Sequence, residues 1–233
     1  MDVRATIADN VARVEERIAA AALAAGRDPA SITLVAVSKY VDAPMAAALL
    51  AAGCRDLGES RPQELWHKAA APDLAGARWH LIGRLQRNKI RRTLPLADLV
   101  HSVDSLRLLT AIDDEARQTG AAPGVLLEVN CSGDQEKQGF APEEIRRLIP
   151  ALAAVVHVRV RGLMTMAPLE GDPVAARRAF ASLRELRGEL AQAAPPHVAL
   201  EELSMGMSGD FEAAIAEGAT IVRIGSLLFE GVR

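Results

Sequence analysis

Lys39 is the residue with the clearest capacity for covalent chemistry in this sequence. The chain holds only four lysines among its 27 basic residues, and this one follows the apolar run 32–38, which is rich in β-branched side chains. Such a run predicts a strand buried on both faces. A desolvated amine can lose its proton and act as a nucleophile or Schiff-base partner, which a guanidinium cannot. The alternative is that Lys39 is simply the first solvated residue after the strand.

Two further segments have the composition of an anion site. Residues 204–210, Ser-Met-Gly-Met-Ser-Gly-Asp, are expected to lead into a helix that starts near Ser208, and residues 223–226, Arg-Ile-Gly-Ser, give a second small turn. A hydroxyl and backbone N–H groups at a helix N-terminus favour negative charge. Ordinary N-capping at Ser208 and ordinary turn glycines would explain either segment alone, and Asp210 competes for the same dipole. The two segments together favour a phosphate site.

The elements that must position these residues alternate between strand and helix along the whole chain. A helix is expected over 2–25, followed by strands at 32–38, 54–57, 79–82, 99–102, 125–130, 158–164, 200–204 and 220–224. Eight strands separated by helices predict a single (β/α)8 TIM-type barrel domain over residues 1–233. About eight residues follow the last strand, so the leading helix is expected to replace the last helix of the ring. An open doubly wound sheet is the alternative.

Three local details follow from this scheme. Ser60 is expected to cap the helix that begins at about Arg61, with Gln63 completing a capping box. Tyr40 would point away from Lys39 if the first strand continues that far. Cys54 and Cys131 are expected inside strands as reduced core residues, because neither has a CxxC partner or a nearby histidine.

Closure of a barrel would bring Lys39 beside the turns after strands seven and eight. An amine that can form an imine, held next to a phosphate anchor, is the equipment that pyridoxal phosphate requires. Arg223 and Ile224 alternate on the last strand, so one of them points inward. An arginine inside a barrel needs a partner, and the pyridine nitrogen of this cofactor would be one.

The sequence also resembles the pyridoxal-phosphate-binding homeostasis proteins, which are related in fold to the barrel domain of alanine racemase. The resemblance covers nearly the whole chain, and its motifs occur in the expected order. They are Val37-Ser38-Lys39, Leu57-Gly58-Glu59, Trp79-His80-Leu81-Ile82-Gly83 with Leu85-Gln86 and Asn88-Lys89, His101-Ser102-Val103-Asp104, Arg161-Gly162-Leu163-Met164, residues 203–208 and residues 222–226.

The resemblance implies a role for particular residues. Lys39 would hold pyridoxal phosphate as a Schiff base, Ser208 and the backbone of Gly225 and Ser226 would hold its phosphate, and Arg223 would lie by its pyridine nitrogen. The family usually has Gly-Glu-Asn-Tyr after strand two, whereas Ser60 and Arg61 stand here, so a contact to the ring could be lost. The complete expected set of cofactor-binding residues is Lys39, Ser60, His80, Met164, Ser204, Met207, Ser208, Arg223, Gly225 and Ser226.

The expected function is that of a cofactor-binding protein in vitamin B6 homeostasis, without a dedicated catalytic reaction. Alanine racemases use a tyrosine from a second domain, but this chain has one tyrosine, Tyr40, next to Lys39. His80 is the remaining candidate base for a racemase-like activity. A structural role, in which His80 is a hydrogen-bonded residue at a strand end, is at least as good an interpretation. An aldolase-type enzyme that uses Lys39 on a phosphorylated carbonyl substrate is a further alternative.

Composition sets limits on partners and location. The formal net charge of −3 argues against a polyanion binder, and the basic run Arg84, Arg87, Lys89, Arg91 and Arg92 has no interleaved aromatic residue, which favours a solvated helix face. No signal-peptide pattern or apolar run of about 18 residues occurs. We therefore expect a cytoplasmic monomer that binds no nucleic acid or membrane, with apo-enzymes that need the cofactor as recipients.

Overall fold

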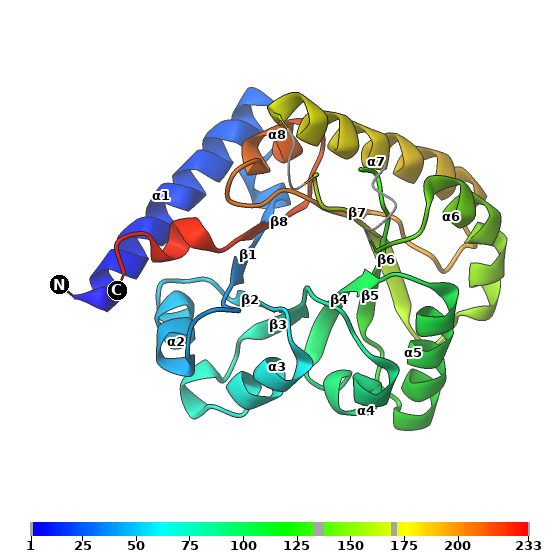
Figure 1. Ribbon diagram of the computed structural model, residues 1–233, viewed down its shortest axis with the longest axis horizontal. Coiled ribbons are helices and arrows are strands. Elements are labelled where there is room, and N and C mark those ends of the chain that lie inside the picture. The colour runs from blue at the N-terminus through cyan, green and yellow to red at the C-terminus, as the bar shows by residue number, and fades with distance from the viewer. Residues whose placement is uncertain (1, 133–137, 169–171, 233) are drawn as a thin grey trace.

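Eight parallel strands pair edge to edge in chain order and close into a barrel (Figure 1). The computed structural model describes residues 2–132, 138–168 and 172–232. β1 pairs with both β2 and β8, with Thr33 opposite Ile221 in the closing pair. The predicted (β/α)8 barrel is confirmed, and the open sheet is excluded. The strands are β1 Thr33–Val37, β2 Asp56–Glu59, β3 Arg78–Leu81, β4 Ala97–Val103, β5 Gly124–Glu128, β6 Arg159–Met164, β7 Glu202–Ser204 and β8 Ile221–Ile224.

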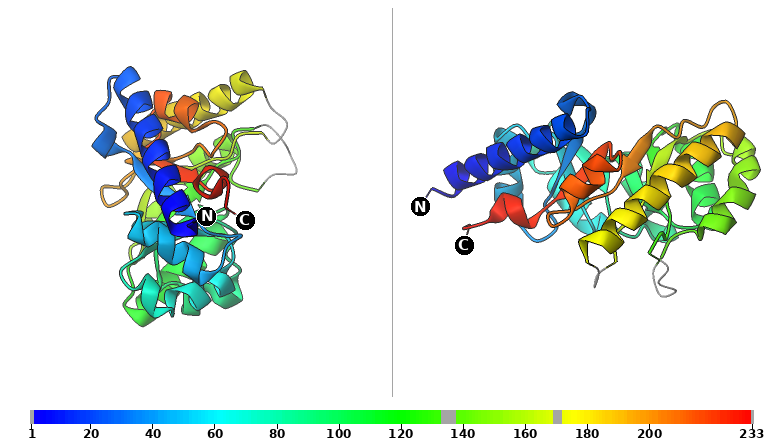
Figure 2. Two further views of the ribbon diagram at one scale, coloured as in Figure 1. Left: turned by 90° about the vertical axis from the view of Figure 1, so that its left-hand side faces the viewer. Right: turned by 90° about the horizontal axis from the view of Figure 1, so that it is seen from above.

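The helices form a ring outside the strands (Figures 1 and 2). The α-helices are α1 Val3–Ala24, α2 Ala43–Ala51, α3 Pro62–Ala69, α4 Ile90–Thr93, α5 Leu106–Thr119, α6 Pro142–Leu148, α7 Pro173–Ala193 and α8 Phe211–Ala216. Short 3-10 helices are η1 Pro29–Ser31, η2 Pro72–Leu74, η3 Arg87–Lys89, η4 Ile149–Ala154 and η5 Ser226–Phe229. The basic helix expected after strand three is therefore a 3-10 turn followed by the four-residue α4.

The leading helix α1 takes the place of the missing last helix, as predicted. Its buried residues recur three or four positions apart, so it presents one apolar stripe to the barrel, as Ile7, Val11, Val14 and Ile18 show. The Asp2 carboxylate accepts a hydrogen bond from the backbone N–H of Arg4 and caps the first turn. α1 then packs between α2 and α8 and also against η5, which closes the outer ring.

Apolar side chains form two separate cores, because neighbouring residues of a strand point to opposite faces. The larger core lies between the strands and the surrounding helices. The smaller one fills the barrel interior with Val35, Leu99, Leu126, Met164 and Ile221. The fold thus resembles other barrels of this class in having a packed interior and not an open pore.

One predicted helix cap and one predicted helix start are wrong, and at each a carboxylate accepts a hydrogen bond from a nearby backbone N–H group. α3 begins at Pro62, and Oε1 of Glu59 accepts hydrogen bonds from the N–H groups of Ser60 and Arg61, so Ser60 is not the cap. α8 begins at Phe211, and the Asp210 carboxylate accepts the N–H of Met207 at 2.6 Å, which holds residues 207–210 in a turn.

The cysteines are free thiols, but neither lies inside a strand. Cys54 precedes β2 and Cys131 follows β5. Burial raises the pKa of the Cys54 thiol to about 12, so it stays protonated. No set of three or more potential metal ligands occurs among the described residues. None of the helices in that same part of the chain is both long and apolar enough to cross a membrane.

Asn10 provides a test of the ring closure by α1. Its side-chain amide is buried and donates to the carbonyl oxygens of Leu228 and Glu230 at 3.1 and 2.9 Å, which ties α1 to the end of the chain. Asn10→Ala leaves two acceptors without their donor and should lower the free energy of unfolding by about 1–3 kcal/mol in urea titrations. Asp9→Ala, at an exposed neighbour on the same helix, is the control and should change little; equal losses would contradict the role of Asn10.

Candidate functional site

A cavity of about 500 Å³ opens at the carboxyl ends of the strands, and we call it the mouth cavity. It brings together seven of the ten residues expected from the sequence: Lys39, Ser60, Met207, Ser208, Arg223, Gly225 and Ser226. The other lining residues are Val37, Tyr40, Val41, Ile82, Met166, Gly209 and Phe229. His80, Met164 and Ser204 are buried and do not line this cavity.

Lys39 reaches the mouth cavity from a turn that directly follows β1. The strand ends at Val37, Ser38 is fully buried, and Lys39 is exposed. Since the strand does not continue, Tyr40 does not point away as expected but lines the same cavity, and Nζ of Lys39 lies 4.8 Å from the centre of its ring. Tyr40 is therefore a neighbour of the amine and not a group that faces it from across the cavity.

A buried ion pair fixes the backbone on which Lys39 stands. Nζ of Lys68 lies 2.6 Å from Oε2 of Glu59, and the two side chains are 3% and 0% exposed. The same ammonium group donates to the carbonyl oxygen of Ser38 at 2.7 Å, while Oε1 of Glu59 accepts the N–H of Ser60. One buried pair thus holds both the residue before Lys39 and the start of the Ser60 turn.

The turns after β7 and β8 form one wall of the mouth cavity. The N–H of Gly225 donates to Oγ of Ser208 at 3.2 Å, which joins the two turns. Gly206 has a φ of +91° and lies against α8, where a Cβ would come within 2.6 Å of Cβ of Ala214 and 2.9 Å of Cα of Phe211. Only glycine therefore fits at this position, and its conformation turns the chain toward the cavity.

Arg223 points into the barrel, whereas Ile224 packs in the outer core, which settles the alternation left open by the sequence. Its guanidinium donates to Oγ of Ser204 at 2.6 Å and to the carbonyl oxygen of Thr165 at 3.1 Å. Burial lowers the pKa of Arg223 to about 10, against the opposing effects of Glu128 and Asp210. The group therefore carries a full positive charge at neutral pH.

Glu128 is a titratable residue of this end of the barrel that the sequence analysis did not single out. It ends β5 on the same face as Leu126, which packs in the barrel interior. Burial, reinforced by Asp104 and opposed by Arg223, raises the pKa of its carboxyl group to about 7. The signal in the sequence was the two-residue spacing between Leu126 and Glu128, which puts both side chains on the same face of a strand. The strand register was needed to show that this face points into the barrel.

The donor set of the mouth cavity fits pyridoxal phosphate. An exposed amine can form an imine, the joined turns offer a hydroxyl and backbone N–H groups for a phosphate, and the buried guanidinium offers a positive charge to a ring nitrogen. Apolar side chains complete the walls beside a planar ring, namely Val37, Val41, Ile82, Met166, Met207 and Phe229.

Comparison with known proteins agrees with this geometry. Residues 5–232 match the family model described as alanine racemase, N-terminal domain. A pyridoxal phosphate homeostasis protein from Pseudomonas aeruginosa is 44% identical over 225 residues, which cover 96% of this chain and 95% of that protein. The chain belongs to the pyridoxal phosphate homeostasis protein family.

Solved structures place this family member among its relatives. PipY of Synechococcus elongatus, whose structure has pyridoxal phosphate bound, is 38% identical with a TM-score of 0.85, and the match covers 96% of this chain and 99% of that one. Alanine racemase from Streptomyces coelicolor is 21% identical with a TM-score of 0.74, and the match covers 97% of this chain and 58% of that one. The second likeness extends to the fold alone.

The Glu59–Lys68 pair gives a first prediction for the site. Lys68→Met would leave the Glu59 carboxylate buried without its countercharge, so the free energy of unfolding should fall by about 3–5 kcal/mol. Combining it with Glu59→Gln should recover part of that loss, as measured by urea unfolding. Arg117→Met, which removes an exposed pair with Asp114, is the matched control and should cost less than about 1 kcal/mol. A Lys68→Met protein as stable as this control would contradict the role of the pair.

The raised pKa of Glu128 predicts a pH-dependent stability. The folded protein keeps a proton on this group between the ordinary value of 4.5 and about 7, where the unfolded chain releases it. The stabilisation is therefore complete below pH 4.5 and is lost as the pH rises through 7. Glu128→Gln should remove this loss, so its stability relative to the parent should increase across that range by roughly 2–3 kcal/mol. The exposed Glu16→Gln is the control, and a Glu128→Gln gap that does not change with pH would rule the assignment out.

Proposed function

We propose that this protein binds pyridoxal 5'-phosphate in the mouth cavity, with Lys39 as its Schiff-base partner, and serves in the homeostasis of this vitamin B6 cofactor. The observation that carries the proposal is that the exposed Lys39 shares one cavity with the joined Ser208–Gly225 turns and the buried Arg223. Among the described residues no other lysine lines this cavity. The PipY structure with bound pyridoxal phosphate supports the identity of the cofactor.

Each side chain has a role that follows from its position. Ser208, Gly225 and Ser226 would hold the phosphate on one wall, with the N–H of Gly225 exchanging its bond to Oγ of Ser208 for a phosphate oxygen. The charged Arg223 would face the ring nitrogen and keep it unprotonated, which weakens the ring as an electron sink. Ser60 and Met207 would contact the ring from the sides.

The three expected residues that do not line the cavity would act from beneath it. Met164 packs in the inner core, Ser204 supports Arg223, and His80 lies deeper in the barrel. The bound cofactor would supply an electrophilic aldehyde carbon, and the protein would supply the amine and the anchors that retain it. We propose that residues 1–233 form a single domain that binds pyridoxal phosphate and carries it.

A carrier role agrees better with this site than a racemase-like reaction. Tyr40 lies on the same side as Lys39, and the likeness to alanine racemases extends only to the fold. We propose that the protein is a cytoplasmic monomer that delivers its cofactor to apo-enzymes. Transfer of pyridoxal phosphate from the loaded protein to an apo-enzyme, followed by recovery of that enzyme's activity, would test the last step.

Borohydride reduction of the loaded protein followed by peptide mass spectrometry tests the central assignment. A pyridoxyl mass should appear on the Lys39 peptide and disappear in Lys39→Ala. Lys89→Ala changes a lysine that does not line the cavity and should leave labelling intact. An unmodified Lys39 after incubation with pyridoxal phosphate would overturn the proposal and favour a carbonyl substrate in its place.

A further inference from the structure

A continuous row of hydrogen-bonded polar side chains crosses the barrel interior, and we call it the interior polar row. It consists of Asp56, His80, His101, Ser204 and Arg223, and each of these is 8% exposed or less. Nε2 of His80 lies 3.0 Å from Oδ1 of Asp56, and Nδ1 of His80 lies 2.9 Å from Nε2 of His101. Nδ1 of His101 is then 2.9 Å from Oγ of Ser204, which accepts from Nη1 of Arg223 at 2.6 Å.

At each end of the row the direction of the hydrogen bond is fixed by a group that can only donate or only accept. A guanidinium can only donate, so Arg223 donates to Ser204 at one end. At the other end burial opposes ionisation of Asp56, but hydrogen bonds from His80 and Arg78 outweigh it and lower the pKa of Asp56. Asp56 is therefore an ionised carboxylate, which can only accept.

The arrangement of protons between these ends depends on how many protons His80 carries. The Ser204 oxygen has two lone pairs, so while it accepts from Arg223 it can either donate to Nδ1 of His101 or accept from it. Burial is the main cause that lowers the pKa of His101 well below its usual value, so this ring is neutral. Since Nε2 of His80 donates to Asp56, a singly protonated His80 accepts at Nδ1 from Nε2–H of His101, and Nδ1 of His101 accepts from the Ser204 hydroxyl. This is the direction that we assign to the row, and a doubly protonated His80 would give the opposite direction between the rings.

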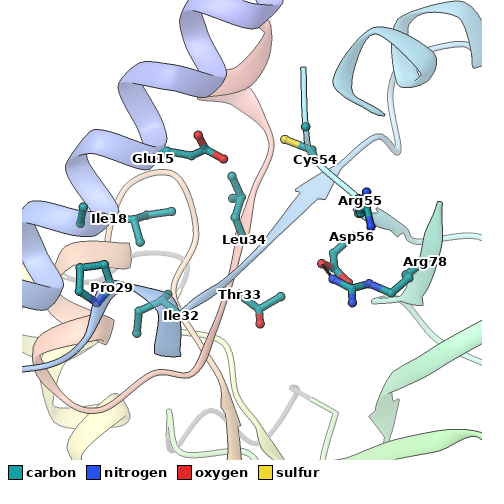
Figure 3. Close-up of a pocket in the computed structure, with 12 residues that line it drawn as sticks. Glu15, Ile18, Pro29, Ile32, Thr33, Leu34, Cys54, Arg55, Asp56 and Arg78 are labelled. Atoms are coloured by element: carbon teal, nitrogen blue, oxygen red, sulfur yellow. Dashed lines mark hydrogen bonds and ion pairs between the residues drawn. The ribbon is translucent and has the colours of Figure 1, made fainter. Parts of the chain in front are cut away.

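The row links opposite ends of the barrel. Arg223 lines the mouth cavity at the carboxyl ends of the strands. Asp56 and Arg78 begin β2 and β3, and they line a second cavity of about 420 Å³ at the amino ends, where Figure 3 shows their side chains pointing toward each other. Five polar residues inside a barrel whose inner core consists of Val, Leu, Ile and Met side chains are costly unless every bond is made.

We propose that Asp56, His80, His101 and Ser204 are positioning residues that hold the Arg223 guanidinium in one orientation toward the ring nitrogen of the cofactor. The acceptor-only carboxylate of Asp56 sets the direction of the whole row, so the hydrogen-bonding state of Arg223 depends on a residue at the far end of the barrel. The role of Arg223 toward the ring rests on the proposed function, whereas the direction of the row is a property of the protein without its cofactor.

Nitrogen-15 NMR of the histidine rings in the cofactor-free protein tests the direction. In the assigned direction each ring carries a single proton, on Nε2, and a second proton on Nδ1 of His80 would overturn it. In Asp56→Asn the amide oxygen should accept from Arg78, which can only donate, so the amide NH₂ group faces His80. Nε2 of His80 must then accept, which reverses the row and moves the proton of each histidine to Nδ1. The control is Asp98→Asn. The Asp98 carboxylate lies at the same end of the barrel but accepts from the backbone N–H of Trp79, so this variant should leave both histidine rings unchanged.

The parent spectrum decides the question even if Asp56→Asn fails to fold. A proton on Nδ1 of His101 in the parent protein would overturn the assigned direction, as would an Asp56→Asn protein that keeps both protons on Nε2.

A double-mutant cycle on the loaded protein tests the link to Arg223. Asp56→Asn weakens the hydroxyl acceptor that holds Arg223, and Ser204→Ala removes it. Each variant should therefore lower the pH midpoint of the bound cofactor's visible absorption. The double variant should shift it no further than Ser204→Ala alone, because that change already cuts the row. Additive shifts would overturn the link. A parent protein that binds no pyridoxal phosphate would refute the proposed function instead, and the NMR result would still stand.

Discussion

The buried pair of Glu59 and Lys68 is the interaction on which the geometry of the mouth cavity depends. Two charges with almost no exposed surface are costly to desolvate, and here each also bonds to a nearby backbone. These bonds fix the exits of β1 and β2, which are the adjacent strands that carry Lys39 and Ser60. The charges thus convert a flexible turn after a strand into a defined platform for an exposed amine.

The same logic governs the barrel interior. Arg223 is charged and almost completely buried, and it is tolerated because its hydrogen bonds continue through Ser204 and two histidines to a carboxylate. The apolar inner core surrounds this row without interrupting it. The interior therefore combines a small hydrophobic core with one fully connected polar path, which specifies side-chain orientation more strictly than apolar packing alone.

The sequence was sufficient for features that depend on local pattern. Apolar runs predicted the strands, and the alternation of Arg223 with Ile224 showed that one of them faces inward. It was insufficient where long-range pairing or a particular side-chain bond decides the outcome. α8 starts later than predicted because the Asp210 carboxylate accepts a hydrogen bond from the N–H of Met207. Tyr40 lines the cavity because β1 ends at Val37, before it reaches Tyr40. Glu128 and His101 could be recognised only once the strand register placed them inside.

The outer ring of helices is closed by the first and the last segments of the chain. α1 rests on α8 and η5, and β1 completes its pairing only with β8. These contacts have very large sequence separation, so the apolar stripe of α1 is completely covered only after α8 and β8 have folded. A chain that has folded only its early strands therefore leaves part of that stripe uncovered, which places a demand for chaperone protection on α1.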